Sequence, residues 1–252
     1  MDYWIEEVGH PERLILAWQA SDELKDRVRW AVGELTAEGN GGRFRYYAGD
    51  EFQRLNAGRE PDALRDAGFL GYPAFNARKS SEPVIFRDGV IDAFMRRLPP
   101  PTRSDFPRYL EHFRLRSASG LSPLSLLAVT EARLPSDGFS LIDPLDVDAP
   151  ARDVVFEIAG HRHNTESREA IIPGQPLDLV PEPDNAHDAN AIRIEASGAL
   201  IGRINRLQAP TFGRWLKERA VSAWLLRLNG TPEKPRAFAF VRVRPLRQSR
   251  AA

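Results

Sequence analysis

The chain has 252 residues, of which 42% are hydrophobic and 28% are charged, a composition typical of ordinary globular domains. It contains no cysteine, which excludes disulfides, thiolate nucleophiles and every cysteine-based metal site. Lysine plus arginine equals aspartate plus glutamate overall, at 35 each, but the two halves differ: residues 1–150 hold 19 basic and 24 acidic side chains, and residues 151–252 hold 16 and 11. We therefore expect two domains and a basic C-terminal surface that suits polyanionic partners.

The sequence shows no sign of export or membrane insertion. Three of the first seven residues, Asp2, Glu6 and Glu7, are acidic, whereas a signal peptide would carry basic residues there. No window contains the roughly 18 apolar residues that a membrane span needs. We expect a cytoplasmic protein that makes no contact with membranes.

The first half of the chain combines short strands with helices. Strands are predicted over residues 13–18, 27–35 and 42–47. Helices are predicted over residues 90–98, 105–113 and 122–134. Ser122 is a suitable N-cap because Pro123 follows it at the first helical position. The aromatic segment at residues 68–75 is either a partner contact or a plug in the core, and we favour the plug.

Residues 141–150 mark the predicted domain boundary. They hold two prolines and three aspartates without a sustained hydrophobic period. We expect an α+β fold, with a mixed α+β domain over residues 1–146 and a second domain over residues 153–247.

The second half is dominated by strands in which apolar and polar residues alternate. We expect about six strands, near residues 154–158, 177–179, 192–195, 199–204, 221–228 and 236–244. Ser197-Gly198 predicts a hairpin turn. One helix is expected over residues 208–219. A small barrel or partly open sheet with an inserted helix is the simplest arrangement.

One motif in this half is long enough to suggest a family. Residues 183–192 read Pro-Asp-Asn-Ala-His-Asp-Ala-Asn-Ala-Ile, and a strand, a turn and a return strand with Gly202 follow. This order resembles the Asn-Pro-Tyr-Asp-x-Asn-Ala-Ile turn of HIRAN domains and their glycine-containing return strand. Residues 160–163 are similar to the Gly-x-Arg-aromatic segment of the same family. The resemblance covers residues 153–247.

The resemblance implies an OB-like β-barrel that binds nucleic acid. Family members lie beside the motor of helicase-like chromatin remodellers or stand alone in bacteria, and some bind the 3′ end of single-stranded DNA. The nucleic-acid-binding positions that it implies are Arg162, His163, His187, Asp188, Arg203 and Arg206. Asn185, Asn190 and Gly202 are implied as structural residues of the turn and return strand. Both aromatic positions are histidine here, which predicts weaker or more pH-sensitive stacking on bases.

Asp188 has two readings that the sequence leaves open. A carboxylate can accept a hydrogen bond from a terminal 3′-OH, whereas it would repel the phosphate of an internal nucleotide. Asp188 would then select strand ends, while Arg162 and Arg206 would bind phosphates. Alternatively Asn185, Asp188 and Asn190 cap the turn with Asx-type hydrogen bonds, a role that we favour for the two asparagines.

A metal-dependent hydrolase is a weaker alternative. His161 and His163 would share one face if they lay on a strand, which is half of a metal site. No fourth ligand, P-loop, carboxylate pair or serine nucleophile elbow is visible in the sequence. We expect no catalytic residue, no metal and no cofactor.

The N-terminal half resembles, more loosely, the small N-terminal subdomain of HipA-type kinases. The similarity lies in four segments, at residues 32–35, 42–46, 94–99 and 125–127. It implies a docking or antitoxin-like component that contacts a protein partner and has no kinase core. This is the main alternative to nucleic-acid binding.

The end of the chain offers a second candidate surface. Phe238 and Phe240 share their parity with Arg242 and Arg244 on a predicted strand, and aromatic and basic residues on one face suit a single-strand platform. In the competing interpretation, the phenylalanines are core and the arginines are solvated.

Overall fold

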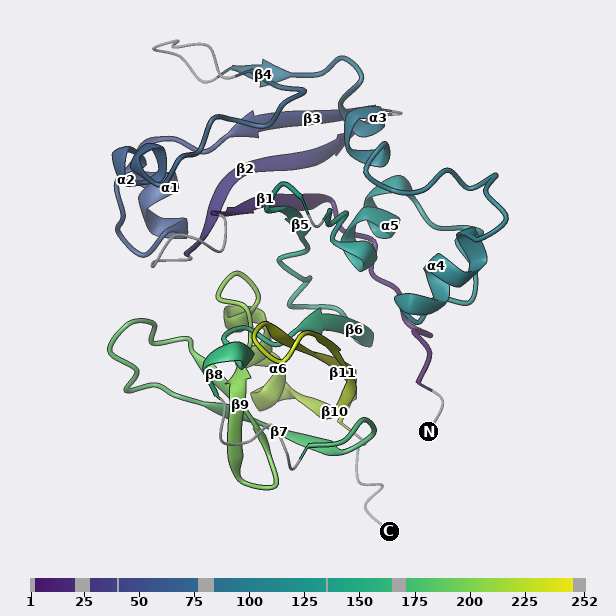
Figure 1. Ribbon diagram of the computed structural model, residues 1–252, viewed down its shortest axis with the longest axis vertical. Helices are drawn as coiled ribbons and strands as arrows, with labels where there is room; N and C mark the ends of the chain where they lie inside the picture. Colours follow the sequence, from purple (N-terminus) through teal and green to yellow (C-terminus); the bar gives the residue numbers. More distant parts are fainter. Residues whose placement is uncertain are drawn as a thin grey trace. The chain divides into compact units, whose positions relative to one another are not determined.

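The computed structural model describes residues 3–20, 28–39, 41–76, 84–134, 136–164 and 171–246. It divides into two compact units (Figure 1). The C-terminal unit comprises residues 1–9, 111–116 and 145–252, and the N-terminal unit comprises residues 10–110 and 117–144. No pattern in the sequence indicated that residues 1–9 and 111–116 pack with the C-terminal half.

The N-terminal unit is built on a five-stranded antiparallel sheet with the order β4-β3-β2-β1-β5. Its strands are β1 (Arg13–Gln19), β2 (Arg29–Glu38), β3 (Gly41–Tyr46), β4 (Ile85–Phe86) and β5 (Phe139–Ile142). The three strands predicted at the start of the chain are confirmed. The first two residues of the predicted boundary segment at residues 141–150, Leu141 and Ile142, are fully buried and belong to β5.

Five helices accompany this sheet: α1 (Gly49–Leu55), α2 (Pro61–Asp66), α3 (Val90–Met95), α4 (Phe106–His112) and α5 (Pro123–Thr130). The three predicted helices are present but shorter than expected. Ser122 caps α5 as predicted, because its Oγ accepts a hydrogen bond from the backbone N–H of Ser125 at 3.1 Å. The sequence analysis missed α1 and α2, which are only one to two turns long.

The aromatic segment at residues 68–75 is a plug, as we favoured. Tyr72 and Phe75 are buried and pack against Phe94. The hydroxyl of Tyr46 fixes the segment, since it donates to the carbonyl of Phe75 at 2.6 Å and accepts from the backbone N–H of Tyr72 at 2.7 Å. The core of the unit therefore reaches into this loop.

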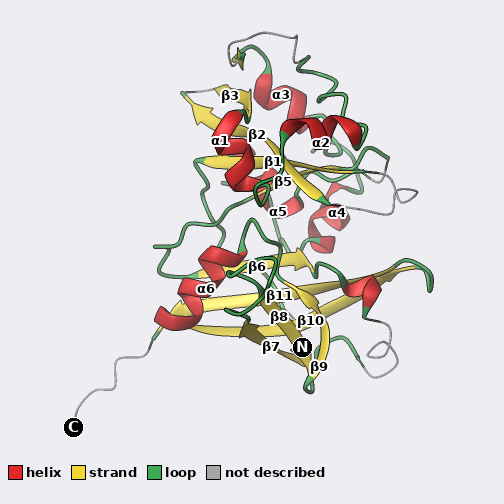
Figure 2. Cartoon of the chain, turned by 90° about the vertical axis from the view of Figure 1, so that its left-hand side faces the viewer, coloured by secondary structure: helices red, strands yellow, loops and turns green. Residues whose placement is uncertain are grey.

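The C-terminal unit holds a six-stranded antiparallel sheet with the order β6-β11-β10-β7-β8-β9 (Figure 2). Its strands are β6 (Arg152–Glu157), β7 (Pro176–Pro181), β8 (Ile192–Ala196), β9 (Ala199–Arg203), β10 (Arg219–Gly230) and β11 (Pro235–Pro245). All six predicted strands are confirmed. Ser197 and Gly198 both have positive φ, at 51° and 81°, as a tight turn between β8 and β9 requires.

One helix, α6 (Ala209–Glu218), lies between β9 and β10 as expected. Phe212 and Trp215 are its buried aromatic residues, and they join the apolar side chains of the sheet in one core. The indole Nε1 of Trp215 also donates to the carbonyl of Val147 at 3.0 Å. The overall class is α+β, with antiparallel sheets in both units.

Candidate nucleic-acid interface

The two edge strands of the C-terminal sheet meet at one point. Ala159, just after β6, and Arg203, at the end of β9, exchange two backbone hydrogen bonds of 2.9 and 2.8 Å. Gly202 makes this approach possible, because a Cβ at its position would lie 2.6 Å from the carbonyl oxygen of Ala159. The sheet thus curls until its edges touch, which brings the Gly160–His163 segment next to β9.

The segment from His161 to His163 is a 3₁₀ turn, so the expectation of a strand with both histidines on one face is wrong. His161 is buried, and its Nδ1 lies 2.9 Å from the carbonyl oxygen of Ile201. His163 is exposed, and its Nε2 accepts a hydrogen bond from Nε of Arg162 at 3.0 Å. The two imidazoles therefore have separate environments. Among the described residues, no group of three or more histidine, aspartate or glutamate side chains is arranged to hold a metal ion.

The turn at residues 183–191 is organised by two Asx-type contacts. Asn185 Oδ1 accepts from the backbone N–H groups of His187 and Asp188 at 3.0 and 3.2 Å, which confirms the capping role that we favoured for Asn185. Asp188 Oδ1 accepts from the backbone N–H of Asn190 at 2.9 Å. Asn190 thus takes part in this contact through its backbone N–H and not through its side chain. Asp188 caps the turn with one oxygen, which leaves its carboxylate half-exposed and fixed in direction.

Arg203 links the turn to the return strand. Its guanidinium donates to both carboxylate oxygens of Glu182, at 2.7 and 3.2 Å, and Asn185 Nδ2 donates to the same carboxylate at 3.3 Å. The hydrogen bond from Arg203 lowers the pKa of Glu182. Because this pair engages Arg203, its main effect in the structure is to hold the turn against β9.

The structure therefore brings together the segments that carry the predicted site. Ile201 and Arg203 on β9 contact His161, Ala159 and Glu182, so the Arg162-His163 turn and the Asp188 turn both attach to the end of one strand. Arg206 follows three residues later in the turn before α6 and is half-buried. Sequence reasoning missed Glu182, and the acid immediately before the motif was its only signal.

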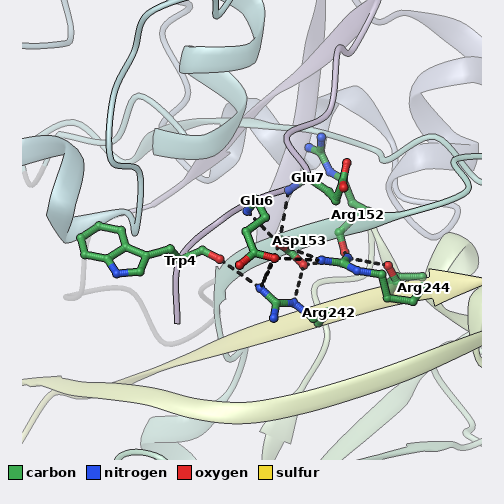
Figure 3. Close-up of polar contacts among 8 residues, drawn as sticks. Trp4, Glu6, Glu7, Arg152, Asp153, Arg242 and Arg244 are labelled. Carbon is green, nitrogen blue, oxygen red and sulfur yellow. Dashed lines mark hydrogen bonds and ion pairs between the residues drawn. The ribbon is translucent and has the colours of Figure 1, made fainter. Parts of the chain in front are cut away.

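The basic end of β11 has a different environment (Figure 3). The side chain of Asp153 is fully buried and forms ion pairs with Arg242 at 3.0 Å and Arg244 at 2.9 Å. Its Oδ2 also accepts from the backbone N–H groups of Glu6 and Glu7 at 2.9 and 3.3 Å. We call Asp153, Glu6, Arg242 and Arg244 the Asp153 network. Burial alone would raise the pKa of Asp153, but hydrogen bonds from the two arginines hold it below its usual value.

The N-terminal segment covers this end of the sheet. Tyr3 stacks on Phe240 with a centroid distance of 5.2 Å and also contacts Trp224 at 4.9 Å. Arg242 donates to the carbonyl of Trp4 at 3.2 Å, and Glu6 lies 3.4 Å from the same guanidinium. Phe240 is therefore buried under Tyr3, although it lies on the side of β11 opposite the main hydrophobic core of the sheet. This end of the strand is an internal contact and not an open platform.

Comparison with known families decides the identity of this unit. Residues 152–241 match the family model of the HIRAN domain. These residues form a HIRAN domain. The resemblance to HIRAN domains that the sequence indicated is therefore confirmed.

One solved structure is similar to the HIRAN domain of this chain. It is the crystal structure of the HIRAN domain of human HLTF, at 16% identity and a TM-score of 0.30, and the match covers 36% of this chain and 74% of the HLTF chain. No curated protein matches the chain. The HIRAN domain is a nucleic-acid-binding module, so the assignment supports a nucleic-acid-binding role.

The other expectations have different outcomes. None of the helices described here is long and apolar enough to cross a membrane. The resemblance of the N-terminal unit to HipA-type kinases, and its docking role, stay predictions.

Proposed function

We propose that the HIRAN domain of this chain binds single-stranded nucleic acid and holds its 3′-OH end. The observation that carries the proposal is the position of Asp188, whose carboxylate is fixed by the turn that Arg203 and Glu182 attach to β9. A fixed carboxylate can accept a hydrogen bond from a terminal hydroxyl, and it repels a phosphate at the same place.

The neighbouring residues have complementary roles in this proposal. Arg162 and Arg206 bind backbone phosphates, because a guanidinium offers several charged donors in a planar fork. His163 and His187 are exposed on either side and stack on the terminal bases. Arg203, Asn185, Asn190 and Gly202 hold the turn and the return strand in place.

The test compares two oligonucleotides that differ only at the 3′ end. Fluorescence anisotropy of the full chain should show tighter binding to a 3′-OH strand than to the same strand with a 3′-phosphate, by about 1–3 kcal/mol. Asp188→Asn keeps an oxygen for the Asn190 N–H and removes the charge, so the preference should shrink. The matched control is Asp184→Asn, which removes the same charge from an exposed position in the same turn.

The phosphate contacts have a separate signature. Arg206→Ala should weaken both oligonucleotides alike and reduce the log–log salt slope by about 0.7, the value for one phosphate of a single strand. Equal affinity of the wild-type chain for the two ends would reject the role of Asp188. Absence of binding at low salt would reject single-strand binding altogether.

A further inference from the structure

A second group of arginines lies on the outer side of the β10–β11 hairpin, within the C-terminal unit. Arg227 on β10 and Arg236 on β11 flank Phe238, with guanidinium carbons 4.1 and 5.3 Å from its ring centroid. Arg114 and Arg116 lie over the ring of Trp4, at 6.0 and 5.2 Å. We call Arg114, Arg116, Arg227 and Arg236 the Arg227 cluster.

The positive charge of this cluster is poorly compensated. Glu157 forms an ion pair with Arg236 at 2.7 Å. Within the described residues, no carboxylate forms an ion pair with Arg114, Arg116 or Arg227. The buried Nε of Arg227 has no hydrogen-bond acceptor there either, while Nη1 donates to the carbonyl of His112 at 2.8 Å. The described residues therefore provide no ion-pair partner for three of these four arginines.

The pKa values of Arg227 and His112 are consistent with the same excess of positive charge. Burial, together with Arg114 and Arg236, lowers the pKa of Arg227 to about 10. Burial and the same group of arginines, with Arg227 included, also lower the pKa of His112. The fold therefore holds a positive potential at this place that its own acids do not neutralise.

Two aromatic rings orient the guanidinium groups without neutralising them. An ion pair fixes an arginine and cancels its charge, whereas a cation–π contact fixes its plane and leaves the charge available. The backbone conformation at Arg114 also helps to position its side chain. Arg114 has a φ of 60°, in the left-handed region that few non-glycine residues adopt, and its carbonyl accepts from the backbone N–H of Ile5 at 2.9 Å.

We infer that the Arg227 cluster binds phosphodiester groups of the nucleic acid whose end the HIRAN pocket holds. A bound phosphate would supply the missing anion. The inference rests on the proposed function, and it adds a second contact to it. Arg236 pairs with Glu157, whose Cα lies at most about 18 Å from the Cα of Arg162 because only five residues separate them. One strand several nucleotides long can span both.

The test uses oligothymidylates of two lengths with a 5′ fluorescent label and a 3′-OH. A strand of about 3 nucleotides fills the end pocket alone, and one of about 15 nucleotides also reaches the cluster. The double variant Arg114→Met/Arg227→Met should lower the affinity for the long strand at least tenfold, the typical loss for a charged hydrogen bond, and leave the short strand unchanged. The salt slope of the long strand should fall by about 0.7 per lost phosphate.

Two further variants exclude a structural explanation. Arg116 is exposed, so Arg116→Met cannot damage the core, and it should weaken the long strand alone. Arg214→Met is the matched control, because it removes the same charge from α6, where Arg214 already pairs with Glu218 at 3.1 Å. This control should change neither affinity beyond about twofold, the level expected for an exposed ion pair.

The outcomes separate the two proposals. Unchanged binding of the long strand by the cluster variants would overturn the second contact and leave the end pocket in place. Wild-type binding of the long strand alone, reduced by the same variants, would support the cluster and reject the end pocket. Failure of the wild-type chain to bind either strand would reject both.

Discussion

The outer face of the β10–β11 hairpin carries two groups of arginines that differ in how their charge is compensated. In the Asp153 network, two guanidinium groups share a fully buried carboxylate, and Glu6 adds a second acid. In the Arg227 cluster, Glu157 pairs with Arg236, and the guanidinium groups are oriented chiefly by aromatic rings. A compensated group stabilises the fold, whereas an uncompensated one costs stability until an anion arrives. The same residue type thus has opposite roles on neighbouring stretches of one strand pair.

The largest expected effect comes from removing the buried acid. Asp153→Ala leaves two arginines and two backbone N–H groups without their acceptor, which should lower the free energy of unfolding by about 3–5 kcal/mol. Urea unfolding followed by tryptophan fluorescence measures the change. Glu6→Ala is the control, since Glu6 is 63% exposed and should cost at most about 1 kcal/mol. Equal effects of the two substitutions would contradict the central position of Asp153.

Replacing one arginine of each group sharpens the comparison. Arg242→Met removes charged hydrogen bonds to Asp153 and one to the carbonyl of Trp4, and it should cost about 2 kcal/mol. The matched substitution Arg227→Met loses one hydrogen bond but also relieves desolvation and repulsion. Its net effect should lie within about 1 kcal/mol of zero, in thermal or urea unfolding. A loss for Arg227→Met as large as that for Arg242→Met would show that both groups are structural.

Acid should weaken the Asp153 network. The folded-state pKa of Asp153 is lowered from 3.8, so its ionised form is stabilised by folding. The stability that it contributes is complete above the unfolded value and is lost as pH falls through the lower folded value. Unfolding free energies should therefore decline from about pH 4 downwards. Asp153→Asn should flatten this decline, and an unchanged profile would argue against the network.

The smallest expected effect is the salt dependence of the unbound chain. Exposed positive charges repel one another less at higher ionic strength. Added sodium chloride should therefore raise the melting temperature of the wild-type chain slightly, by a shift equivalent to roughly 0.5 kcal/mol. Arg114→Met/Arg227→Met should show less of this increase. A wild-type melting temperature that falls with salt would mean that ion pairs dominate over repulsion.

Turns and helix caps could be predicted from the sequence, because a few neighbouring residues determine them. The Ser197-Gly198 turn and the Ser122 cap are each decided within four residues, and both are present. Strand β5 was missed because a short run of three apolar residues and one serine, next to aspartate and proline, resembles a linker until a neighbouring strand pairs with it. The HIRAN motif at residues 183–192 was visible because its spacing lies within one turn and one hairpin.

Long-range contacts could not be predicted in this way. Glu182 and Arg203 meet only because of the registers of β7 with β8 and of β8 with β9. The Arg227 cluster needs residues near 4, 114, 227 and 236 together, and no period or motif connects such positions. The charge asymmetry of the two halves indicated a basic surface but not which arginines remain available.

The contact between Trp4 and Arg242 joins residues 238 positions apart in the sequence. Contacts of such separation are formed late, because the chain must first lose the entropy of a very large loop. Tyr3 cannot stack on Phe240 before β11 has formed. We therefore expect the docking of residues 3–7 onto β11 to be a slow step of folding.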